Sequence, residues 1–266
     1  MIDLNNIDKI IICTFPKVGC STLLKTFKNR RFRIKFKKTK YDVIGIHKIH
    51  KLKQYLSAFK NQNVLIINSC RNLFDQKISH FFEFLSKYDD LLLKSICKNY
   101  NLPLKDMYKN DDLILYLINY FNKNYLNYSD VENCTDHLIS QETEWQQRFS
   151  NVKNFYNNFN EYNIKLKKFN FIDKYNLYVE NNITMLTIRF EDINEWNIIL
   201  SKIFNTEIKL LNDYLTKDKE IYYLYTKFKN TYKYNEEQIN EIKDINFMKL
   251  FYEDEFILDK INSLSF

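Results

Sequence analysis

The segment Phe15–Leu23, FPKVGCSTL, has the residue types of an anion-binding loop. Gly19 lets the backbone approach a ligand closely, Lys17 adds a positive charge, and Ser21 and Thr22 add hydroxyl donors. The segment is not a Walker A motif, because its lysine precedes the glycine and no GK[ST] follows a glycine-rich run. These residues therefore predict a loop that holds a phosphate or sulfate without the magnesium-binding part of that motif.

An arginine and a serine have the spacing of a second phosphate-binding pair. Arg71 directly follows the apolar run Asn63–Cys70, and Ser79 comes eight residues later in a helical pattern. Open α/β sheets bind ligands at the carboxyl ends of their strands. A guanidinium fork and a hydroxyl converging on one phosphate is a sound physical arrangement.

The run His47-Lys48-Ile49-His50 could carry acid–base chemistry. A histidine near neutral pKa can remove a proton from an attacking hydroxyl, and a neighbouring lysine can stabilise charge that develops on a leaving oxygen. A zinc pair is the weaker interpretation, because no third ligand lies nearby in the sequence.

The elements that must position these residues alternate between strands and helices. The periodicity predicts strands at Lys9–Thr14, Tyr41–Ile46, Asn63–Cys70, Tyr175–Val179 and Ile183–Phe190. Helices are predicted at Ser21–Asn29, Leu52–Lys60, 72–85, Ile193–Phe204, through much of 89–160 and over the last 50 residues. The basic stretch Arg30–Lys40 is predicted as a strand with exposed flanks. Alternating strands and helices favour a mainly parallel sheet in an α/β three-layer sandwich.

Composition limits the class of protein. The 266 residues are 45% hydrophobic and include only two glycines and two prolines, the bias expected of an AT-rich coding genome. That composition excludes collagen, Pro-rich or Gly/Ser-rich chains and disulfide scaffolds. Five scattered cysteines without CxxC pairs indicate reduced thiols, and the chain shows neither a signal peptide nor a membrane span. A cytoplasmic location is the expectation.

Positive charge is concentrated in the first third. Residues 1–70 hold 15 Lys and Arg against three acids, whereas the remainder holds 25 against 30. This asymmetry predicts that the first third meets an anion such as a nucleotide, a nucleic acid, sulfate or phosphate. The alternative is a lysine-rich solvated face.

Taken together, the two phosphate motifs resemble those of the P-loop sulfotransferases, which use 3′-phosphoadenosine 5′-phosphosulfate (PAPS). Pro16–Ser21 is similar to that family's PKxGTT signature, with Cys20 in place of the first threonine. Arg71-Asn72 and Ser79 are similar to RNPxxxxxSxxxF, with Leu73 in place of the proline. Arg189–Asp192, RFED, is similar to the YED segment that closes a late strand.

Within that superfamily the chain looks most like the capsular polysaccharide synthesis protein family. That likeness rests on ICTFPKVGCSTL, the HxxH run, SHFFEF and the tail YTKFKNTYKYNEEQINEI, and it covers most of the chain. It implies one sulfotransferase-like domain over 1–266 with a helical insertion at about 87–165.

The resemblance also implies roles for the site residues. The 5′-phosphosulfate of PAPS would be bound by Lys17, Val18, Gly19, Cys20, Ser21 and Thr22, and the 3′-phosphate by Arg71 and Ser79. Lys48-Ile49-His50 is similar to the KTH segment of cytosolic sulfotransferases, so His50 is the expected base, with His47 second. Lys48 and Lys17 would stabilise the developing charge, and no metal is required.

The implied reaction moves a sulfuryl group to a hydroxyl of a carbohydrate-type acceptor, with adenosine 3′,5′-bisphosphate as the product. The expected partners are the nucleotide, a hydroxyl-bearing glycan and, in a homodimer, a second copy of the chain. A non-catalytic nucleotide-binding protein that kept the fold is one alternative. A basic nucleic-acid-binding protein is another, less favoured, and a nucleotide kinase is the poorest because the magnesium-binding part of Walker A is missing.

Overall fold

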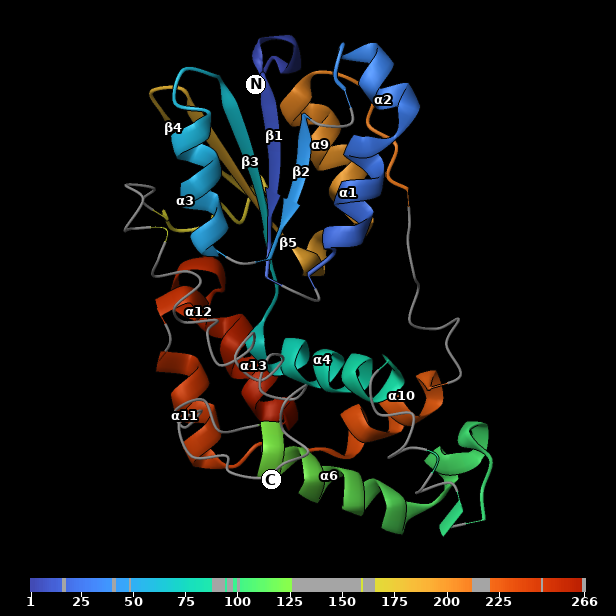
Figure 1. Cartoon of the computed structure of the whole chain (residues 1–266). Helices are drawn as coiled ribbons and strands as arrows, with labels where there is room; N and C mark the ends of the chain where they lie inside the picture. The colour runs from blue at the N-terminus through green and yellow to red at the C-terminus, as the bar shows by residue number, and fades with distance from the viewer. Residues whose placement is uncertain are drawn as a thin grey trace. The chain divides into compact units, whose positions relative to one another are not determined.

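The structure is a computed structural model of the whole chain, shown in Figure 1. It describes residues 1–15, 18–39, 42–47, 49–87, 94, 98–99, 101–125, 159, 166–211, 221–244 and 246–264. The chain forms two compact units, of which the first comprises Met1–Arg71, Val152–Asp213 and Asn246–Tyr252. The second comprises Asn72–Asn151, Tyr214–Ile245 and Glu253–Phe266.

The first unit is built on a five-stranded sheet in the order β2-β1-β3-β5-β4. The strands are β1 (Lys9–Cys13), β2 (Val43–Ile46), β3 (Val64–Cys70), β4 (Tyr175–Glu180) and β5 (Ile183–Arg189). β1, β2, β3 and β5 run parallel, and β4 pairs antiparallel with β5. The prediction of an α/β fold with a mainly parallel sheet is confirmed.

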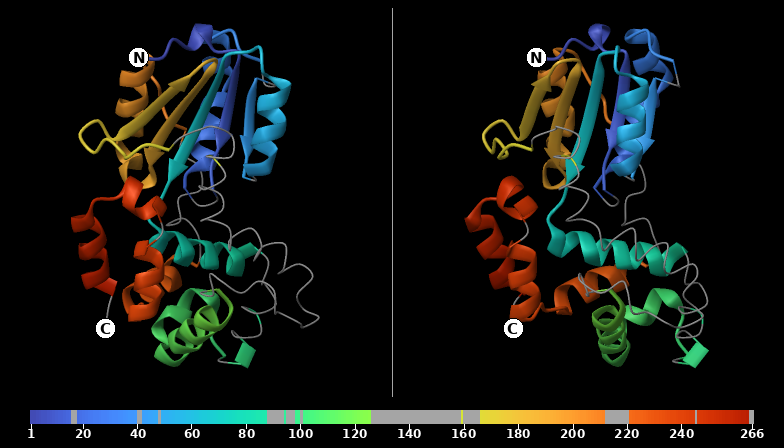
Figure 2. Two further views of the ribbon diagram at one scale, coloured as in Figure 1. Left: turned by 90° about the vertical axis from the view of Figure 1, so that its left-hand side faces the viewer. Right: turned by 60° about the vertical axis from the view of Figure 1, so that its left-hand side comes forward.

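Helices cover both faces of this sheet, an arrangement compatible with a three-layer sandwich (Figures 1 and 2). α1 (Cys20–Lys28) and α9 (Trp196–Phe204) pack on one face against alternate side chains of β1 and β3, among them Ile10, Ile12 and Leu65. α3 (Ile49–Ala58) lies on the other face. Every residue of β3 is buried, as expected for a central parallel strand covered on both sides.

The basic stretch after α1 is a helix, so its prediction as a strand is wrong. α2 spans Arg30–Lys35 and is capped by the Asn29 side chain, which accepts a hydrogen bond from the Arg31 amide. Phe32 and Phe36 are four residues apart, which places both on one helical face, and both are buried. The tertiary contacts of these two rings favour the helix over the predicted strand.

Short elements complete the first unit. They are the 3₁₀ turns η1 (Leu4–Asn6) and η3 (Phe190–Glu195) and the helix α12 (Asn246–Phe251). The β4–β5 hairpin turns through Asn181, which adopts a positive φ of 52°. The expected helix at Ile193–Phe204 therefore begins later, at Trp196, after the 3₁₀ turn.

The second unit is helical in its described part. It contains α4 (Leu73–Lys87), η2 (Leu104–Lys109), α6 (Asp111–Tyr125), α10 (Tyr222–Thr231), α11 (Glu236–Asp244) and α13 (Asp254–Leu264). Aromatic rings form its core: Phe81 packs against Phe121 and Phe228 at centroid distances of 5.1 and 5.6 Å. The helical character expected of the last 50 residues is confirmed.

One buried carboxylate joins three helices of this second unit. Asp75 on α4 forms salt bridges with Lys229 on α10 at 2.7 Å and with Lys260 on α13 at 2.9 Å. Burial alone would raise the pKa of Asp75, but the two lysines outweigh it and hold that pKa well below its usual range. Asn72 caps α4 through the Asp75 amide at 2.9 Å.

Much of the expected helical insertion, residues 126–158 and 160–165, lies outside the described residues. The single-domain interpretation of 1–266 stays a prediction beside the two compact units. None of the described helices is both long and apolar enough to cross a bilayer.

Candidate anion-binding site at the carboxyl edge of the sheet

The sheet topology marks where a ligand would bind. From β1 the chain passes through α1 and α2 on one face to β2, and from β2 it passes through α3 on the other face to β3. The two connections cover opposite faces of the sheet, and β2 and β3 lie on opposite sides of β1, so the strand order has a topological switch point beside β1. Open α/β sheets bind ligands outside the carboxyl ends of the strands at such points. The candidate site therefore lies where β1 and β3 end.

Gly19 opens α1 at this edge. It is the N-cap residue, with φ 86° and ψ 17°, a left-handed conformation that side chains other than glycine's rarely adopt. No side chain caps the helix, so its first N–H groups keep their donor capacity. An uncapped helix N-terminus directly after a buried parallel strand is an anion-binding geometry.

Two aromatic rings pack over the glycine. A Cβ atom added at Gly19 would lie 2.5 Å from the Trp196 indole and 3.3 Å from the Phe190 ring. The indole is fully buried and donates its N–H to the Arg189 carbonyl at 2.7 Å. Gly19 is thus required twice, once for its backbone conformation and once because Trp196 occupies the space of a side chain.

The loop is also tied to the neighbouring strand. Ser69, near the end of β3, donates its hydroxyl to the Val18 carbonyl at 2.6 Å, and both residues are buried. Two other buried polar side chains, Thr14 and Asn68, have atoms without a hydrogen-bond partner in the described part of the chain. Because such groups cost stability, this end of the sheet is not optimised for packing alone.

Arg71 leaves β3 at the same edge. Its guanidinium lies over the Phe190 ring, 4.6 Å from the ring centroid, which favours a fixed orientation of the charge. The Phe190 ring therefore lies close both to the Arg71 guanidinium and to the space beside Gly19.

A second arginine holds the turn that carries Phe190. Arg189 pairs with Asp192 through Nε at 2.9 Å and through a terminal nitrogen at 3.4 Å. The Arg189 guanidinium also lies 4.8 Å from the Phe169 ring centroid and 5.9 Å from that of Tyr252, whose hydroxyl donates to Glu191 at 3.0 Å. Arg189 is thus engaged in the structure of the RFED turn, and the Arg71 guanidinium lies over the Phe190 ring of the same turn.

His47 is the histidine that the structure connects to this edge. It follows β2, and its Nδ1 lies 3.0 Å from the Thr14 carbonyl. A carbonyl only accepts, so Nδ1 carries the proton in the neutral ring and Nε2 is the nitrogen that can accept one. This is the tautomer that a general base needs.

The predicted phosphate-loop residues have distinct roles in the structure. Ser21 is exposed on the first turn of α1, while Thr22 is buried. Cys20 is also buried, and its side chain belongs to the hydrophobic core. Only the backbone of Cys20 can therefore face a ligand, whereas the Ser21 hydroxyl is exposed.

Several predicted residues cannot be placed. Lys17 and Lys48 lie outside the described residues, and so does the side chain of His50, whose backbone begins α3. Ser79 is half-buried on α4 in the second unit, whereas Arg71 ends a segment of the first. The pairing of Arg71 with Ser79 therefore stays a prediction.

The buried thiols near this edge are not reactive groups. Burial raises the pKa of Cys13 far above its ordinary value, and burial is also the main cause that raises the pKa of Cys70. Both side chains are fully buried. A thiol held protonated in this way is a poor nucleophile and a poor metal ligand.

Comparison of the chain with protein-family models, with curated proteins and with solved structures found no match. The interpretation of the site therefore rests on its geometry and on the sequence motifs. Sequence reasoning missed Ser69, Phe190 and Trp196 as parts of it. Phe190 lies inside the RFED segment, but nothing in the sequence indicates that its ring contacts Arg71.

Proposed function

We propose that the protein is a PAPS-dependent sulfotransferase of the P-loop sulfotransferase-like fold, acting on a hydroxyl of a carbohydrate-type acceptor. The observation that carries the proposal is the uncapped N-terminus of α1, opened by Gly19 directly after β1 at a topological switch point. The PKVGCS sequence of this loop and Arg71 on the adjacent strand favour a 3′-phosphorylated nucleotide over ATP or GTP.

Each part of the site supplies one part of the chemistry. The α1 amides, the Ser21 hydroxyl and Lys17 bind the 5′-phosphosulfate, and Arg71 binds the 3′-phosphate, together with Ser79. The acceptor oxygen attacks sulfur in line, and the bond from sulfur to the bridging phosphate oxygen breaks as the new bond forms. Adenosine 3′,5′-bisphosphate leaves, with Lys48 and Lys17 stabilising the charge that develops on its oxygen.

The proton of the acceptor hydroxyl passes to a histidine. We assign this role to His47, because its Nδ1 contact with the Thr14 carbonyl leaves Nε2 as the proton acceptor. His50 stays the alternative, as the similarity to the KTH segment implies. His47→Gln and His50→Gln variants separate the two: loss of sulfate transfer with unchanged nucleotide binding identifies the base.

The first test is a thermal-shift comparison. Adenosine 3′,5′-bisphosphate should stabilise the protein, whereas ATP, GTP and single-stranded DNA should not, because only the first combines a 5′-phosphate for the loop with a terminal 3′-phosphate for Arg71. Lys17→Ala should abolish the shift, and Lys28→Ala, which removes an exposed lysine at the other end of α1, should retain it. Equal stabilisation by ATP, or a full shift with Lys17→Ala, would contradict the proposed site.

A non-catalytic nucleotide-binding protein is the second candidate, favoured by Cys20. Its side chain is buried in the core where the family signature has a threonine, so one hydroxyl contact is lost from the loop. Tight bisphosphate binding without sulfate transfer from PAPS to any member of a glycan panel would support this candidate. Transfer to one glycan would exclude it.

A further inference from the structure

Helix α2 and the residues around it form the densest positive surface of the described chain. Eight basic residues and no acidic residue occur between Lys25 and Lys38. The chain contains only six arginines, and three of them are Arg30, Arg31 and Arg33. The cluster is therefore more than the general abundance of lysine in this sequence.

Buried phenylalanine rings hold α2 against the rest of the first unit. Phe32 lies 4.8 Å from Phe27 and 4.7 Å from Phe36, measured between ring centroids. Lys38 donates to the Ile7 carbonyl, and Lys35 donates to the Thr206 hydroxyl. These contacts fix the helix. Lys28, Arg30, Arg31 and Lys37 are exposed, and the half-buried Arg33 donates its Nε to the Lys28 carbonyl at 3.0 Å.

Four of the basic residues in this cluster have no carboxylate partner in the part of the chain that the structure describes. Within the described residues, no salt bridge involves Lys28, Arg30, Arg31 or Arg33. Lys9, in contrast, lies 2.5 Å from Asp42 and is compensated. Uncompensated charges of one sign on a single face produce a positive potential that attracts a polyanion.

The α2 surface is also separate from the candidate site. α1 begins at the phosphate loop and ends where α2 begins, and its nine residues correspond to a length of about 13 Å. Figure 1 shows α2 near the end of the sheet where β1 begins, whereas the loop follows the end of β1. The nucleotide proposed above therefore does not account for the charge on α2.

An exposed isoleucine indicates the kind of polyanion. Ile34 lies between Arg33 and Lys35 and is 67% exposed, while the rings of Phe32 and Phe36 are buried. Single-stranded nucleic acid is usually held by exposed aromatic rings, and among the described residues in and directly after α2 both rings, Phe32 and Phe36, are buried. A hydrated polysaccharide gains nothing from an exposed aliphatic side chain. A lipid surface uses both features, because anionic headgroups attract the basic residues and the aliphatic group enters the interface.

We infer that α2, with Lys28 and Lys37 beside it, docks the protein on an anionic phospholipid surface. Contact is electrostatic through the arginines and lysines and is reinforced by Ile34. The docked protein keeps its candidate site at the other edge of the sheet. This inference stands independently of the proposed sulfotransferase activity, since none of the α2 residues belongs to that site.

Vesicle co-sedimentation of the full chain tests the inference. Binding should require phosphatidylserine in phosphatidylcholine vesicles and should weaken as salt is raised. Each basic residue near such a surface contributes about a fivefold factor, so replacing Arg30, Arg31 and Arg33 by Gln should lower partitioning about a hundredfold. Ile34→Asn should lower it severalfold without changing net charge.

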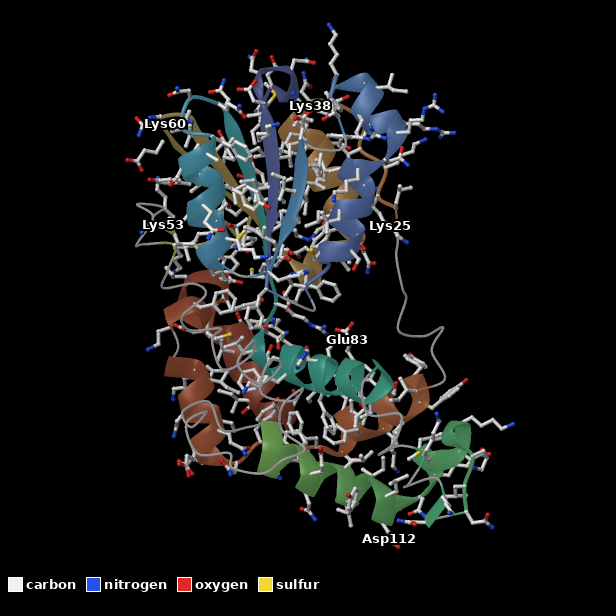
Figure 3. All side chains as sticks on the ribbon, in the orientation of Figure 1. Lys25, Lys38, Lys53, Lys60, Glu83 and Asp112 are labelled. Carbon is white, nitrogen blue, oxygen red and sulfur yellow. The ribbon has the colours of Figure 1, made fainter. Side chains whose placement is uncertain are left out.

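A matched control removes the same charge from another face. Lys51 and Lys53 are exposed on α3 and Lys60 just after it, and Figure 3 labels Lys53 and Lys60 away from Lys25. The triple Lys→Gln variant should keep most of its vesicle binding. Equal losses in both triple variants would overturn the inference, because they would indicate net charge alone.

Two further outcomes would also overturn it. One is binding to phosphatidylcholine and to phosphatidylserine vesicles alike. The other is tighter binding to DNA or to a sulfated glycan than to vesicles, with no effect of Ile34→Asn. Circular dichroism and the thermal unfolding midpoint of each variant confirm that it is folded.

Discussion

The carboxyl edge of the sheet and helix α2 are the two regions that we propose to bind anions, and they would do so by different physical means. At the carboxyl edge the donors are backbone N–H groups, one hydroxyl and a guanidinium held against the Phe190 ring. At α2 the donors are the ends of long, exposed side chains without carboxylate partners among the described residues. The first arrangement is preorganised for one small anion, and the second provides a diffuse field for an extended one.

The proposed nucleotide site therefore does not coincide with the highest density of charge in the sequence. The sequence concentrates positive charge in residues 1–70, yet most of the cluster at Lys25–Lys38 lies along and beyond α1 rather than at the loop that begins it. Rigid placement makes a few donors sufficient at the loop, because little entropy is lost when the anion binds. Four substitutions, each with a matched control, test this contrast.

The largest effect is expected at Gly19. Gly19→Ala forces a positive φ on alanine and brings its Cβ to 2.5 Å from Trp196, so unfolding free energy should fall by about 3 kcal/mol or more. Gly45→Ala brings a Cβ to 2.7 Å from the tip of Leu24, which can move, and should cost about 1 kcal/mol. Urea unfolding followed by Trp196 fluorescence in a Trp145→Phe background measures both. Equal costs would contradict the special role of the loop.

Arginine substitutions distinguish the two regions directly. Arg71→Met should weaken binding of adenosine 3′,5′-bisphosphate about ten- to a hundredfold, the value of a charge-assisted hydrogen bond. Arg31→Met makes the same change on α2 and should leave that affinity unchanged while weakening vesicle binding. Isothermal titration calorimetry gives both affinities. If Arg31→Met weakened the nucleotide as much as Arg71→Met, the separation of the two regions would be wrong.

Ser69 tests the rigidity of the loop itself. Ser69→Ala removes the hydroxyl that bonds the Val18 carbonyl and leaves that buried carbonyl without this donor, at a cost of about 1 kcal/mol. Ser57 on α3 is exposed, so Ser57→Ala should be neutral. Hydrogen exchange of the first α1 amides should accelerate in Ser69→Ala alone. Unchanged exchange would show that the loop does not depend on this hydrogen bond.

The smallest effect is expected at Phe190. Phe190→Leu removes the ring beneath Arg71, and a cation–π contact of about 0.5–1 kcal/mol corresponds to a two- to fivefold weaker binding of the bisphosphate. Adenosine 5′-monophosphate, which lacks the 3′-phosphate, should be unaffected. Phe59→Leu removes a comparable ring beside Lys9 and should change neither affinity. Equal losses for both nucleotides in Phe190→Leu would assign the ring a general packing role.

The order of the strands and helices could be predicted because hydrophobic periodicity is local. Val64–Cys70 and Ile183–Arg189 are β-branched and apolar runs, and their strands begin or end within one residue of the predicted positions. Gly19 could be singled out because glycine is rare in this chain and stands where a strand meets a helix. The prediction failed at α2, where the buried rings of Phe32 and Phe36 decide the conformation.

The contacts that complete the candidate site could not be predicted, because they join distant parts of the chain. Ser69 is 51 residues from Val18, and the Thr14 carbonyl is 33 residues from His47. No residue close to Gly19 in the sequence indicates that the Trp196 ring occupies the space beside it in the structure. Such pairs form only when the order of strands in the sheet brings their ends together.

The sequence by itself determined the α/β fold class, because the hydrophobic periods of strands and helices and the strand–loop–helix pattern are properties of neighbouring residues. It also determined which residue types are available for an anion. Only the tertiary structure decided that Gly19 is enclosed by Trp196 and Phe190, and that the arginines of α2 are displayed away from the loop. The physical reason is that parallel strands all end at the same edge of the sheet, so the loops that follow them lie close together there. The helix after such a loop runs back, and the residues that follow it lie at the opposite edge, where the strands begin.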